Sequence, residues 1–312
     1  MNYSIFEPSP NLEHLIIGSL YSILAIAVFP LSIPIVYTLY TTKELNENVS
    51  YKLINALNIC DLLQSGNHFL TGLFVVFPIL ANQIDPFVRI MGCTTNTLWI
   101  ASFVIIAVLA LTRLGVTFCN MNTDRWQIWM KIILTLGALY IFVIWVIGCV
   151  TLNFQLVGVS WSYDFTVVYT ETLANMELYF CFPILLLSFI SYILILGNIL
   201  KKKRHAQSTS SYHTEIGILA QATVLTTYMG VLIALWHNAE SWFPMTDVTT
   251  AFLHGGWILF PHLNAVLLIS TNRRIRQHFM ASFKGSLKRT TSVNGTTSDN
   301  AIVFNRRPRN LP

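Results

Sequence analysis

The chain has 312 residues, of which 54% are hydrophobic and only 11% are charged, with a formal net charge of +5. Because soluble globular proteins contain about 25% charged residues, this composition argues against a soluble chain and favours a membrane protein. The excess positive charge follows from the membrane topology predicted below and indicates contact with anionic membrane lipid, not with nucleic acid.

Seven long segments carry almost no charge, and Asp61 is the only Asp, Glu, Lys or Arg in any of them. Each is longer than the ~20 residues that a helix needs to cross ~30 Å of hydrocarbon. The connections between them are short and polar. We therefore predict an all-α membrane protein, a bundle of seven transmembrane helices. In chain order, the segments are residues 15–40, 53–81, 90–112, 132–152, 178–200, 216–236 and 248–271.

The remaining residues are divided around this bundle. We expect a short extracellular N-terminus, the bundle, an amphipathic surface helix and a disordered cytoplasmic tail rich in Ser, Thr, Asn and Arg. The surface helix is predicted because Ile275, Phe279 and Phe283 recur every four residues among basic residues, as in helices that lie on a membrane. A disordered basic segment is the alternative. The four parts are residues 1–14, 15–271, 272–286 and 287–312.

Lysine and arginine are distributed unevenly between the two sides of the predicted bundle. The side that holds the N-terminus has Arg89 as its only basic residue, and the opposite side holds all the others of the 19. Since positively charged connections stay in the cytoplasm, we predict that the N-terminus is outside and the C-terminus inside. The protein is therefore expected to be a multi-pass protein of the plasma membrane.

The acid in the second segment is a candidate functional residue. Asp61 is about ten residues from the cytoplasmic start of its helix, roughly 15 Å deep and near the middle of the membrane. Asn58, one turn earlier on the same face, is the expected neighbour. A charge at this depth is costly and indicates either a hydrated cation or proton site that changes between conformations, or a protonated acid that is only hydrogen-bonded.

A single arginine near the end of the third segment is the second candidate. Arg113 is expected at the cytoplasmic end of its helix, where the guanidinium can reach a partner acid. Glu215, at the cytoplasmic start of the sixth helix, is that partner. A bridge between them would hold the third and sixth helices together, and breaking it would open a cleft for a cytosolic protein. The alternative is an arginine that only extends to the lipid headgroups.

Several short motifs lie on this topology in order. The second segment contains LNICDLL at 57–63, the third ends in LTR at 111–113, and the fifth has Pro183. The seventh ends in PHLNAVLLISTNRRIR at 261–276. With these motifs the chain resembles the rhodopsin-like G-protein-coupled receptors, and it is most similar to the nematode serpentine chemoreceptors of the Srt and Srx type.

The motifs depart from the pattern of the wider superfamily. Thr112 and Leu114 replace the acid and the aromatic residue beside the arginine. Asn264 and Leu268 stand where the helix-seven motif has proline and tyrosine. Cys93 matches the outer cysteine of the third helix, yet the second outer loop contains no cysteine. We therefore expect no disulfide between Cys93 and that loop.

The resemblance implies a chemosensory receptor with no enzymatic activity and with neither cofactor nor metal. It would bind a small molecule, an odorant or a metabolite, from the outer side and activate a heterotrimeric G protein, in the plasma membrane or a sensory cilium. The expected switch and coupling residues are Asp61, Asn58, Arg113, Glu215 and Asn264.

The ligand pocket is expected between the outer halves of the third, fifth, sixth and seventh helices. Aromatic residues at that depth also form belts that face the lipid, so each candidate has this alternative. No acid lies in the outer half of the third segment, which argues against a monoamine ligand. The candidate lining residues are Asn96, Trp99, Tyr179, Trp236, His237, His254 and Trp257.

Two other classes of function stay open. A transporter would use Asp61 and the prolines within its helices, but the chain has no internal repeat of the kind found in transporters. A zinc-dependent membrane hydrolase is disfavoured because His254 and His262 are ~12 Å apart along a helix, too far to share an ion with bonds of ~2.1 Å. A retinal pump is excluded, since every lysine is predicted to be cytoplasmic and none lies within a segment.

Overall fold

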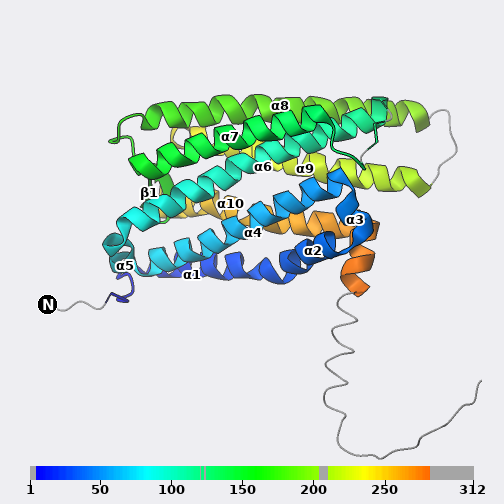
Figure 1. Cartoon of the computed structure of the whole chain (residues 1–312). Coiled ribbons are helices and arrows are strands. Elements are labelled where there is room, and N and C mark those ends of the chain that lie inside the picture. The colour runs from blue at the N-terminus through cyan, green and yellow to red at the C-terminus, as the bar shows by residue number, and fades with distance from the viewer. Residues whose placement is uncertain (1–4, 120, 123, 204–209, 282–312) are drawn as a thin grey trace, which may run out of the picture.

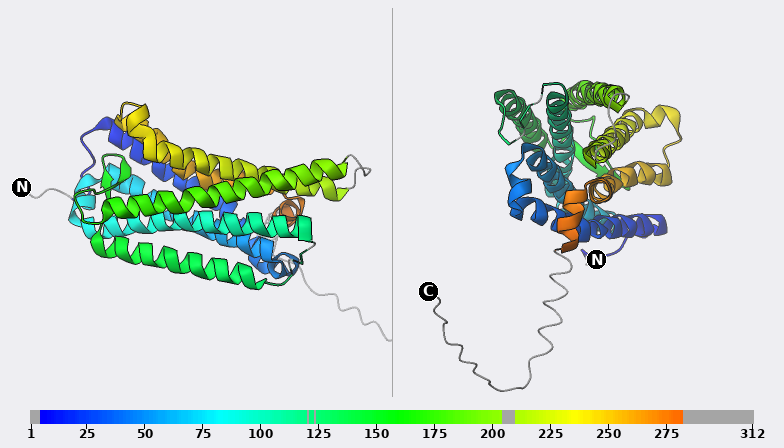
Figure 2. Two further views of the ribbon diagram at one scale, coloured as in Figure 1. Left: turned by 90° about the horizontal axis from the view of Figure 1, so that it is seen from above. Right: turned by 90° about the vertical axis from the view of Figure 1, so that its right-hand side faces the viewer.

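The computed structural model describes residues 5–119, 121–122, 124–203 and 210–281 (Figure 1). In this part of the chain, seven long helical segments lie side by side in one bundle, and the end-on view in Figure 2 shows their grouping. We call the end where α1 begins the N-terminal end of the bundle and the other end, where α10 stops, the C-terminal end. This architecture matches the predicted helical bundle. A short β hairpin, which the sequence analysis did not anticipate, is added to it.

The elements occur in the following order. The helices are α1 (Leu12–Ala27), α2 (Phe29–Thr41), α3 (Lys43–Glu47), α4 (Val49–Val76), α5 (Pro78–Gln83), α6 (Asp85–Cys119), α7 (Ile128–Thr151), α8 (Thr170–Lys203), α9 (Ser210–Trp242) and α10 (Asp247–Thr271). The strands β1 (Phe154–Val157) and β2 (Ser160–Tyr163) lie between α7 and α8.

The first crossing is made by two helices in succession. α1 ends before Val28, which has helical dihedrals, and α2 begins directly after it. Pro30 in the first turn of α2 cannot donate a backbone hydrogen bond to the helix before it, and Pro34 removes one more donor inside α2, which continues past it. The two prolines therefore explain why this crossing is bent and not one straight helix.

α4 carries a row of buried polar side chains. By length and composition, six of the helical segments described could cross a membrane, and α4 is not among them. It carries Asn58, Asp61, Gln64 and His68, and each of these side chains is at most 1% exposed. Polar groups in membrane helices usually face the inside of the bundle. The polarity of α4 thus reflects a polar strip in the interior, and α4 completes the set of seven.

α1 and α4 approach closely at two glycines. A Cβ atom added to Gly72 would lie 2.3 Å from Ser22 Oγ and 2.5 Å from Gly18 O, and one added to Gly18 would lie 2.7 Å from Gly72 O. Small residues let membrane helices pack backbone against backbone, and this contact contributes to association where lipid gives no hydrophobic drive. The two glycines therefore set the distance between α1 and α4.

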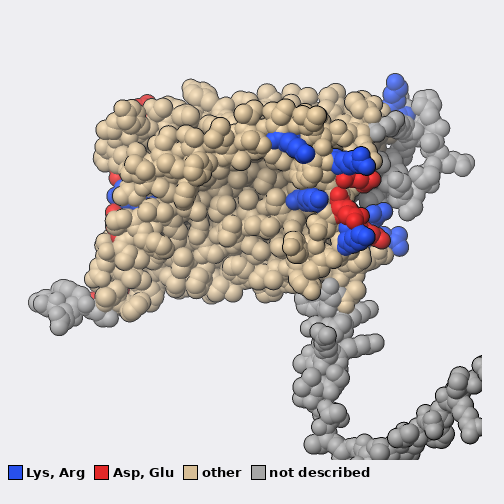
Figure 3. Space-filling view, viewed as in Figure 1, with Lys and Arg blue, Asp and Glu red and all other residues tan. Residues whose placement is uncertain are grey.

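The outer face of the bundle is apolar between its ends. On the face shown in Figure 3, charged side chains gather near the two ends and a broad central zone carries none. On α7, large apolar side chains point outward, among them Leu136 at 61%, Phe142 at 58% and Val150 at 77% exposed. This surface is suited to contact with lipid tails and not with water.

A helix follows α10 after a break at Asn272. Its described part, residues 273–281, carries two of the three apolar residues that predicted a surface helix. Ile275 is 0% and Phe279 6% exposed, and both join a core cluster with Leu53 and Leu268. The apolar face of this segment is therefore turned toward the bundle, so its location on a membrane surface stays a prediction. Phe283 and the tail lie outside the described residues.

Candidate functional site

The β hairpin packs across α6 at the N-terminal end. β1 and β2 are antiparallel, and Gly158 has a φ of +57° in the turn between them, a conformation that favours glycine. Phe154 and Trp161 are 1% and 2% exposed. A Cβ at Gly92 of α6 would lie 2.6 Å from the Trp161 ring. The hairpin therefore lies directly on the backbone of α6.

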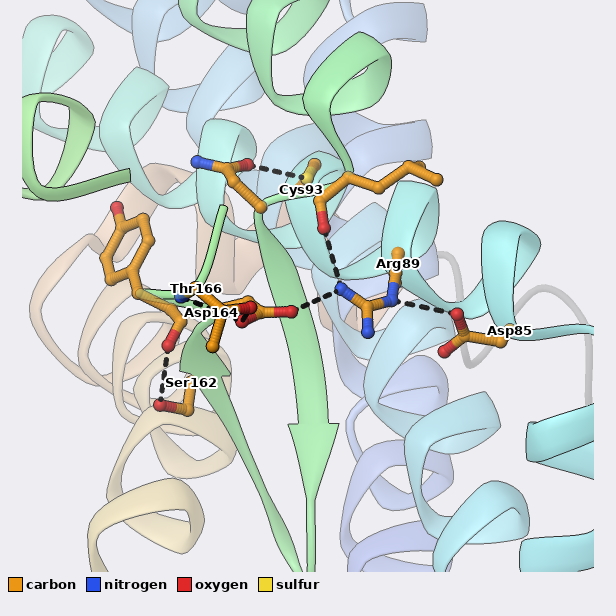
Figure 4. Close-up of polar contacts among 9 residues, drawn as sticks. Asp85, Arg89, Cys93, Ser162, Asp164 and Thr166 are labelled. Atoms are coloured by element: carbon orange, nitrogen blue, oxygen red, sulfur yellow. Dashed lines mark hydrogen bonds and ion pairs between the residues drawn. The ribbon is translucent and has the colours of Figure 1, made fainter. Parts of the chain in front are cut away.

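Arg89 fastens this hairpin to α6 (Figure 4). Its Nε donates to Asp85 Oδ2 at 2.9 Å, and its Nη1 donates to Leu152 O at 2.9 Å and Asp164 Oδ2 at 2.8 Å. Asp164 directly follows β2, and its Oδ1 accepts a hydrogen bond from the Thr166 hydroxyl. The predicted outer side has one basic residue, and that residue connects the start of α6 to both ends of the hairpin.

Cys93 lies one turn further along α6 and forms no disulfide. All five cysteines of the chain are free. The Cys93 thiol is buried and donates to Asn153 Oδ1 at 3.6 Å, and Asn153 O in turn accepts from the Asp164 backbone. Hydrogen bonds and the Arg89–Asp164 ion pair therefore hold the hairpin beside Cys93, where the sequence predicts no disulfide.

We expect Asp164→Asn to loosen the hairpin. Hydrogen bonds to charged groups contribute about 1.5–3 kcal/mol, so amide hydrogen exchange over residues 154–163 should rise about tenfold. The control is Asp85→Asn, because the Asp85 side chain is 52% exposed and that of Asp164 10%, and exposed ion pairs contribute little. Equal exchange rates in the two variants would contradict this role for Asp164.

The same pair sets a dependence on pH. Hydrogen bonds from the Thr166 side chain and from Arg89 lower the pKa of the Asp164 carboxyl below its ordinary 3.8. A carboxyl with a lowered pKa contributes its full stabilising free energy at pH values above its ordinary pKa. This contribution is lost only as the pH falls through the lowered pKa. Exchange protection of the hairpin, corrected for the intrinsic rate, should thus stay constant from pH 7 to pH 5. A loss of protection within that range would contradict the assignment.

A narrow cavity lies between α6, α8, α9 and α10 toward the N-terminal end. Its free volume is about 20 Å³. Trp257 contributes the central ring, with its centroid 5.8 Å from that of Trp99 and 5.7 Å from that of Trp236. Four of the seven predicted pocket residues line this cavity, namely Asn96, Trp99, Trp236 and Trp257, together with Glu177, Leu232, Ile233 and Leu253.

Glu177 is a lining residue that the sequence analysis missed. It is 4% exposed, and its Oε2 accepts hydrogen bonds from the Tyr163 hydroxyl and from Asn96 Nδ2, the latter at 3.1 Å. It directly precedes the charge-free segment 178–200 and therefore looked like a residue of the loop. However, α8 begins at Thr170, so Glu177 lies two turns inside the helix. Predicting that this helix begins upstream of the apolar run would have placed Glu177 inside the bundle.

Three predicted pocket residues do not line the cavity. Tyr179 is 74% exposed and points away from the bundle. His237 is half-buried beside the cavity on α9. His254 is 0% exposed, and its ring packs against Tyr21 and His68, with centroids 4.7 Å and 5.0 Å away. These three residues do not line this cavity, and a role for them in ligand binding stays a prediction.

Two hydrogen bonds join the polar strip of α4 to α10. Trp257 Nε1 donates to Gln64 Oε1 at 2.9 Å, and Asn264 Nδ2 donates to Asp61 Oδ2 at 2.7 Å. Asn58, the expected neighbour of Asp61, is buried but donates instead to Ile54 O in its own helix. Trp257 of the cavity and Asn264, the partner of the buried acid, thus lie two turns apart on α10, at its interface with α4.

Arg113 lies toward the C-terminal end of α6. It is half-buried and lines a space of about 80 Å³ with Tyr192 of α8 and Leu219 of α9. Thr112, which stands at the position of the usual acid, is buried and donates to Val108 O at 2.6 Å. The side chain of Glu215 lies outside the described part of the chain, so its pairing with Arg113 stays a prediction.

The chain matches the model of a known protein family. The model of a family described as "Serpentine type 7TM GPCR chemoreceptor Srt" matches residues 4–292. None of the curated proteins compared matches the chain. The match covers the whole helical bundle, including both hydrogen bonds between α4 and α10.

Proposed function

Because the chain belongs to the Srt family of serpentine seven-transmembrane chemoreceptors, we propose that it binds a small molecule in the tryptophan-lined cavity and activates a heterotrimeric G protein at the C-terminal end. This is a family of multi-span membrane receptors and not of enzymes. The observation that carries the proposal is the cavity itself, which four helices enclose and which has a central ring hydrogen-bonded to α4.

A ligand in this cavity can act on the rest of the bundle through α10. Trp257 touches the ligand space and donates to Gln64, and Asn264 on the same helix donates to Asp61. A ligand that displaces Trp257 therefore changes the force on the interface between α4 and α10. An equilibrium between two arrangements of that interface is the element that a ligand needs in order to act at a distance.

The coupling site is proposed at the other end of α6. Arg113, Tyr192 and Leu219 bring α6, α8 and α9 together around one space. If α9 moves away from α6, the Arg113 guanidinium becomes accessible to a cytosolic protein. In this proposal Asp61, Asn58 and Asn264 form the switch, and Arg113 with Glu215 forms the coupling site.

We expect an epitope tag after Pro312 to be inaccessible on intact cells and a tag before Asn2 to be accessible. The physical reason is the charge asymmetry, with Arg89 as the only basic residue on the predicted outer side. Antibody binding with and without permeabilisation measures both. Staining of the C-terminal tag on intact cells would reverse the topology and with it the assignment of the two sites.

Asp61→Asn should change the response to ligand and leave most of the protein at the cell surface. An amide can still accept from Asn264, but the hydrogen bond loses its charge assistance and is weaker by about 1.5 kcal/mol. Because the proposed ligand acts through this interface, we expect its potency to change roughly tenfold. Exchanging the two residues in the variant Asp61→Asn/Asn264→Asp should restore much of the potency. Loss of surface protein, with normal signalling by what remains, would instead assign Asp61 to folding.

The experiment that tests the whole proposal is a screen of odorants and metabolites on cells that express the full chain, with G-protein activation as the readout. Trp257→Ala should abolish any response found, because it removes the central ring of the cavity. Phe252→Ala, on the same helix but 77% exposed, is the matched control and should respond normally. An active ligand with equal potency on both variants would mean that the cavity is not the binding site.

A further inference from the structure

A buried carboxylate lines the cavity without a basic partner in the described part of the chain. Glu177 is 4% exposed, and none of the ion pairs among the described residues includes it. Its Oε2 accepts both hydrogen bonds, from Tyr163 and Asn96, and Oε1 accepts none from these residues. A carboxylate buried in this way is costly unless a cation pairs with it.

The surroundings of this carboxylate indicate which kind of cation. Trp99, Trp236 and Trp257 line the same cavity, and the face of an indole ring attracts a cation more strongly than any other side-chain ring. Leu232 and Leu253 make the rest of the wall apolar. An inorganic cation such as Ca²⁺ needs six or more oxygen ligands, and among the described residues no cluster of acidic or other metal-binding side chains exists that could supply them.

We propose that the ligand of this receptor is a small organic cation, an amine or a quaternary ammonium compound, with its charged nitrogen at Glu177 and its carbon atoms against the tryptophan rings. This inference rests on the proposed function, since it assigns a ligand class to the cavity proposed there. It also corrects the argument against an amine. The outer half of the third transmembrane segment has no acid, whereas the acid in the cavity is carried by α8.

The dimensions of the cavity limit the size of the ligand. A free volume of about 20 Å³ holds little more than one water-sized group, so a ligand with several carbon atoms must displace side chains of α9 and α10. Trp257 is one of the side chains in its path and is bonded to Gln64. Binding of the cation at Glu177 is thereby linked to movement of the ring that connects the cavity to α4.

The test compares cations with neutral compounds of the same shape. Purified full-length receptor in detergent is titrated with n-butylamine, benzylamine and choline, and with n-butanol, benzyl alcohol and 3,3-dimethyl-1-butanol, while its thermal unfolding midpoint is measured. We expect at least one cation to raise the midpoint at a concentration about tenfold or more below that of its neutral counterpart. No effect from any of the three cations, or equal effects of the cation and its neutral counterpart in all three pairs, would overturn the proposal.

Variants of α8 assign the effect to one carboxylate. Glu177→Gln should abolish the preference for cations, and Glu171→Gln, an exposed acid on the same helix, should retain it. Preference retained in Glu177→Gln would overturn the proposal. Should Glu177→Gln not fold, Glu177→Asp keeps the charge and should retain the preference at reduced affinity, while the comparison on the unaltered receptor still decides the ligand class.

The two proposals can fail separately. Cations that bind through Glu177 but activate no G protein would support the ligand class and contradict the proposed function. Neutral compounds that activate a G protein equally well in the unaltered receptor and in Glu177→Gln would support the function and contradict the ligand class.

Discussion

Gly72→Ala should remove most of the receptor from the cell surface. The added methyl group would lie 2.3 Å from Ser22 Oγ, 2.8 Å from Ser22 N and 2.5 Å from Gly18 O, and two of these atoms belong to the backbone of α1. A flexible side chain can turn aside, but a backbone cannot, so α1 and α4 must separate. Overpacking of this kind costs about 1–3 kcal/mol, and separation also removes the close contacts on which membrane helices depend.

The control for this prediction lies on the same helix. A Cβ at Gly66 would meet no atom within 4 Å, so Gly66→Ala makes no clash and removes a residue that disfavours helix by about 1 kcal/mol. Surface expression and the thermal unfolding midpoint of purified protein measure both variants. We expect a several-fold loss and a fall of several degrees for Gly72→Ala only. Wild-type behaviour of Gly72→Ala would mean that α1 and α4 do not pack this closely.

Arg113→Ala should abolish G-protein activation while the ligand still binds. Arg113 is the arginine of the LTR motif, it is half-buried, and it lines the space between α6, α8 and α9. The cavity for the ligand is at the opposite end of the bundle, so affinity should change little. Arg125→Ala is the matched control, because Arg125 is exposed on the same predicted side. Normal signalling by Arg113→Ala at matched surface levels would reduce Arg113 to a membrane anchor.

The predicted restraint on this arginine has a smaller effect. An ion pair at a partly hydrated boundary contributes only about 1 kcal/mol, a few-fold in population. Glu215→Gln should therefore raise ligand-free signalling by a small factor and not switch the receptor fully on. The combined variant Arg113→Ala/Glu215→Gln should show no ligand-free signalling. This result would show that Glu215→Gln acts by releasing Arg113 and not by an indirect effect on α9.

The sequence predicted the helices well because a membrane imposes a simple rule on them. Segments without charge and longer than about 20 residues must cross as helices. Five of the predicted segments lie on one long helix each, 15–40 is divided between α1 and α2, and 53–81 extends past α4 into α5. The boundaries were less accurate. α8 begins at Thr170, well before the apolar run at 178–200, because polar residues continue a helix beyond the hydrocarbon. The omission of Glu177 follows from that error.

The direction in which each side chain points was harder to predict. A helix that is apolar on all sides has no periodic signal to show which face is buried. Tyr179 and Trp236 therefore looked equivalent in the sequence, although Tyr179 is 74% exposed and Trp236 lines the cavity. α4 was the exception, because its polar strip marked the inner face. Even there, the pairing of Asp61 with Asn264, 203 residues away, needed the fold.

The hairpin was missed for a different reason. Phe154, Trp161 and Tyr163 lie on either side of Gly158, which is a hairpin pattern with a turn residue. Because these residues lie between two predicted membrane segments, they were expected to form only a connecting loop. The contact of Trp161 with α6 depends on the absence of a side chain at Gly92, and a glycine inside a helix does not by itself indicate what packs against it.

The way in which Arg89 and Asp164 hold the hairpin has a consequence for how the outer surface responds to its surroundings. A covalent crosslink at this position would make the attachment of the hairpin depend on oxidative folding and sensitive to reductants. An ion pair makes it indifferent to both, so the protein can mature without a disulfide-forming catalyst. Salt should also have little effect, because Arg89 and Asp164 are 2.8 Å apart, well within the ~8 Å screening length at physiological ionic strength, and partly buried pairs are screened little. The attachment of the hairpin to α6 should therefore be insensitive to the redox state, and nearly insensitive to the ionic strength, of the fluid around it.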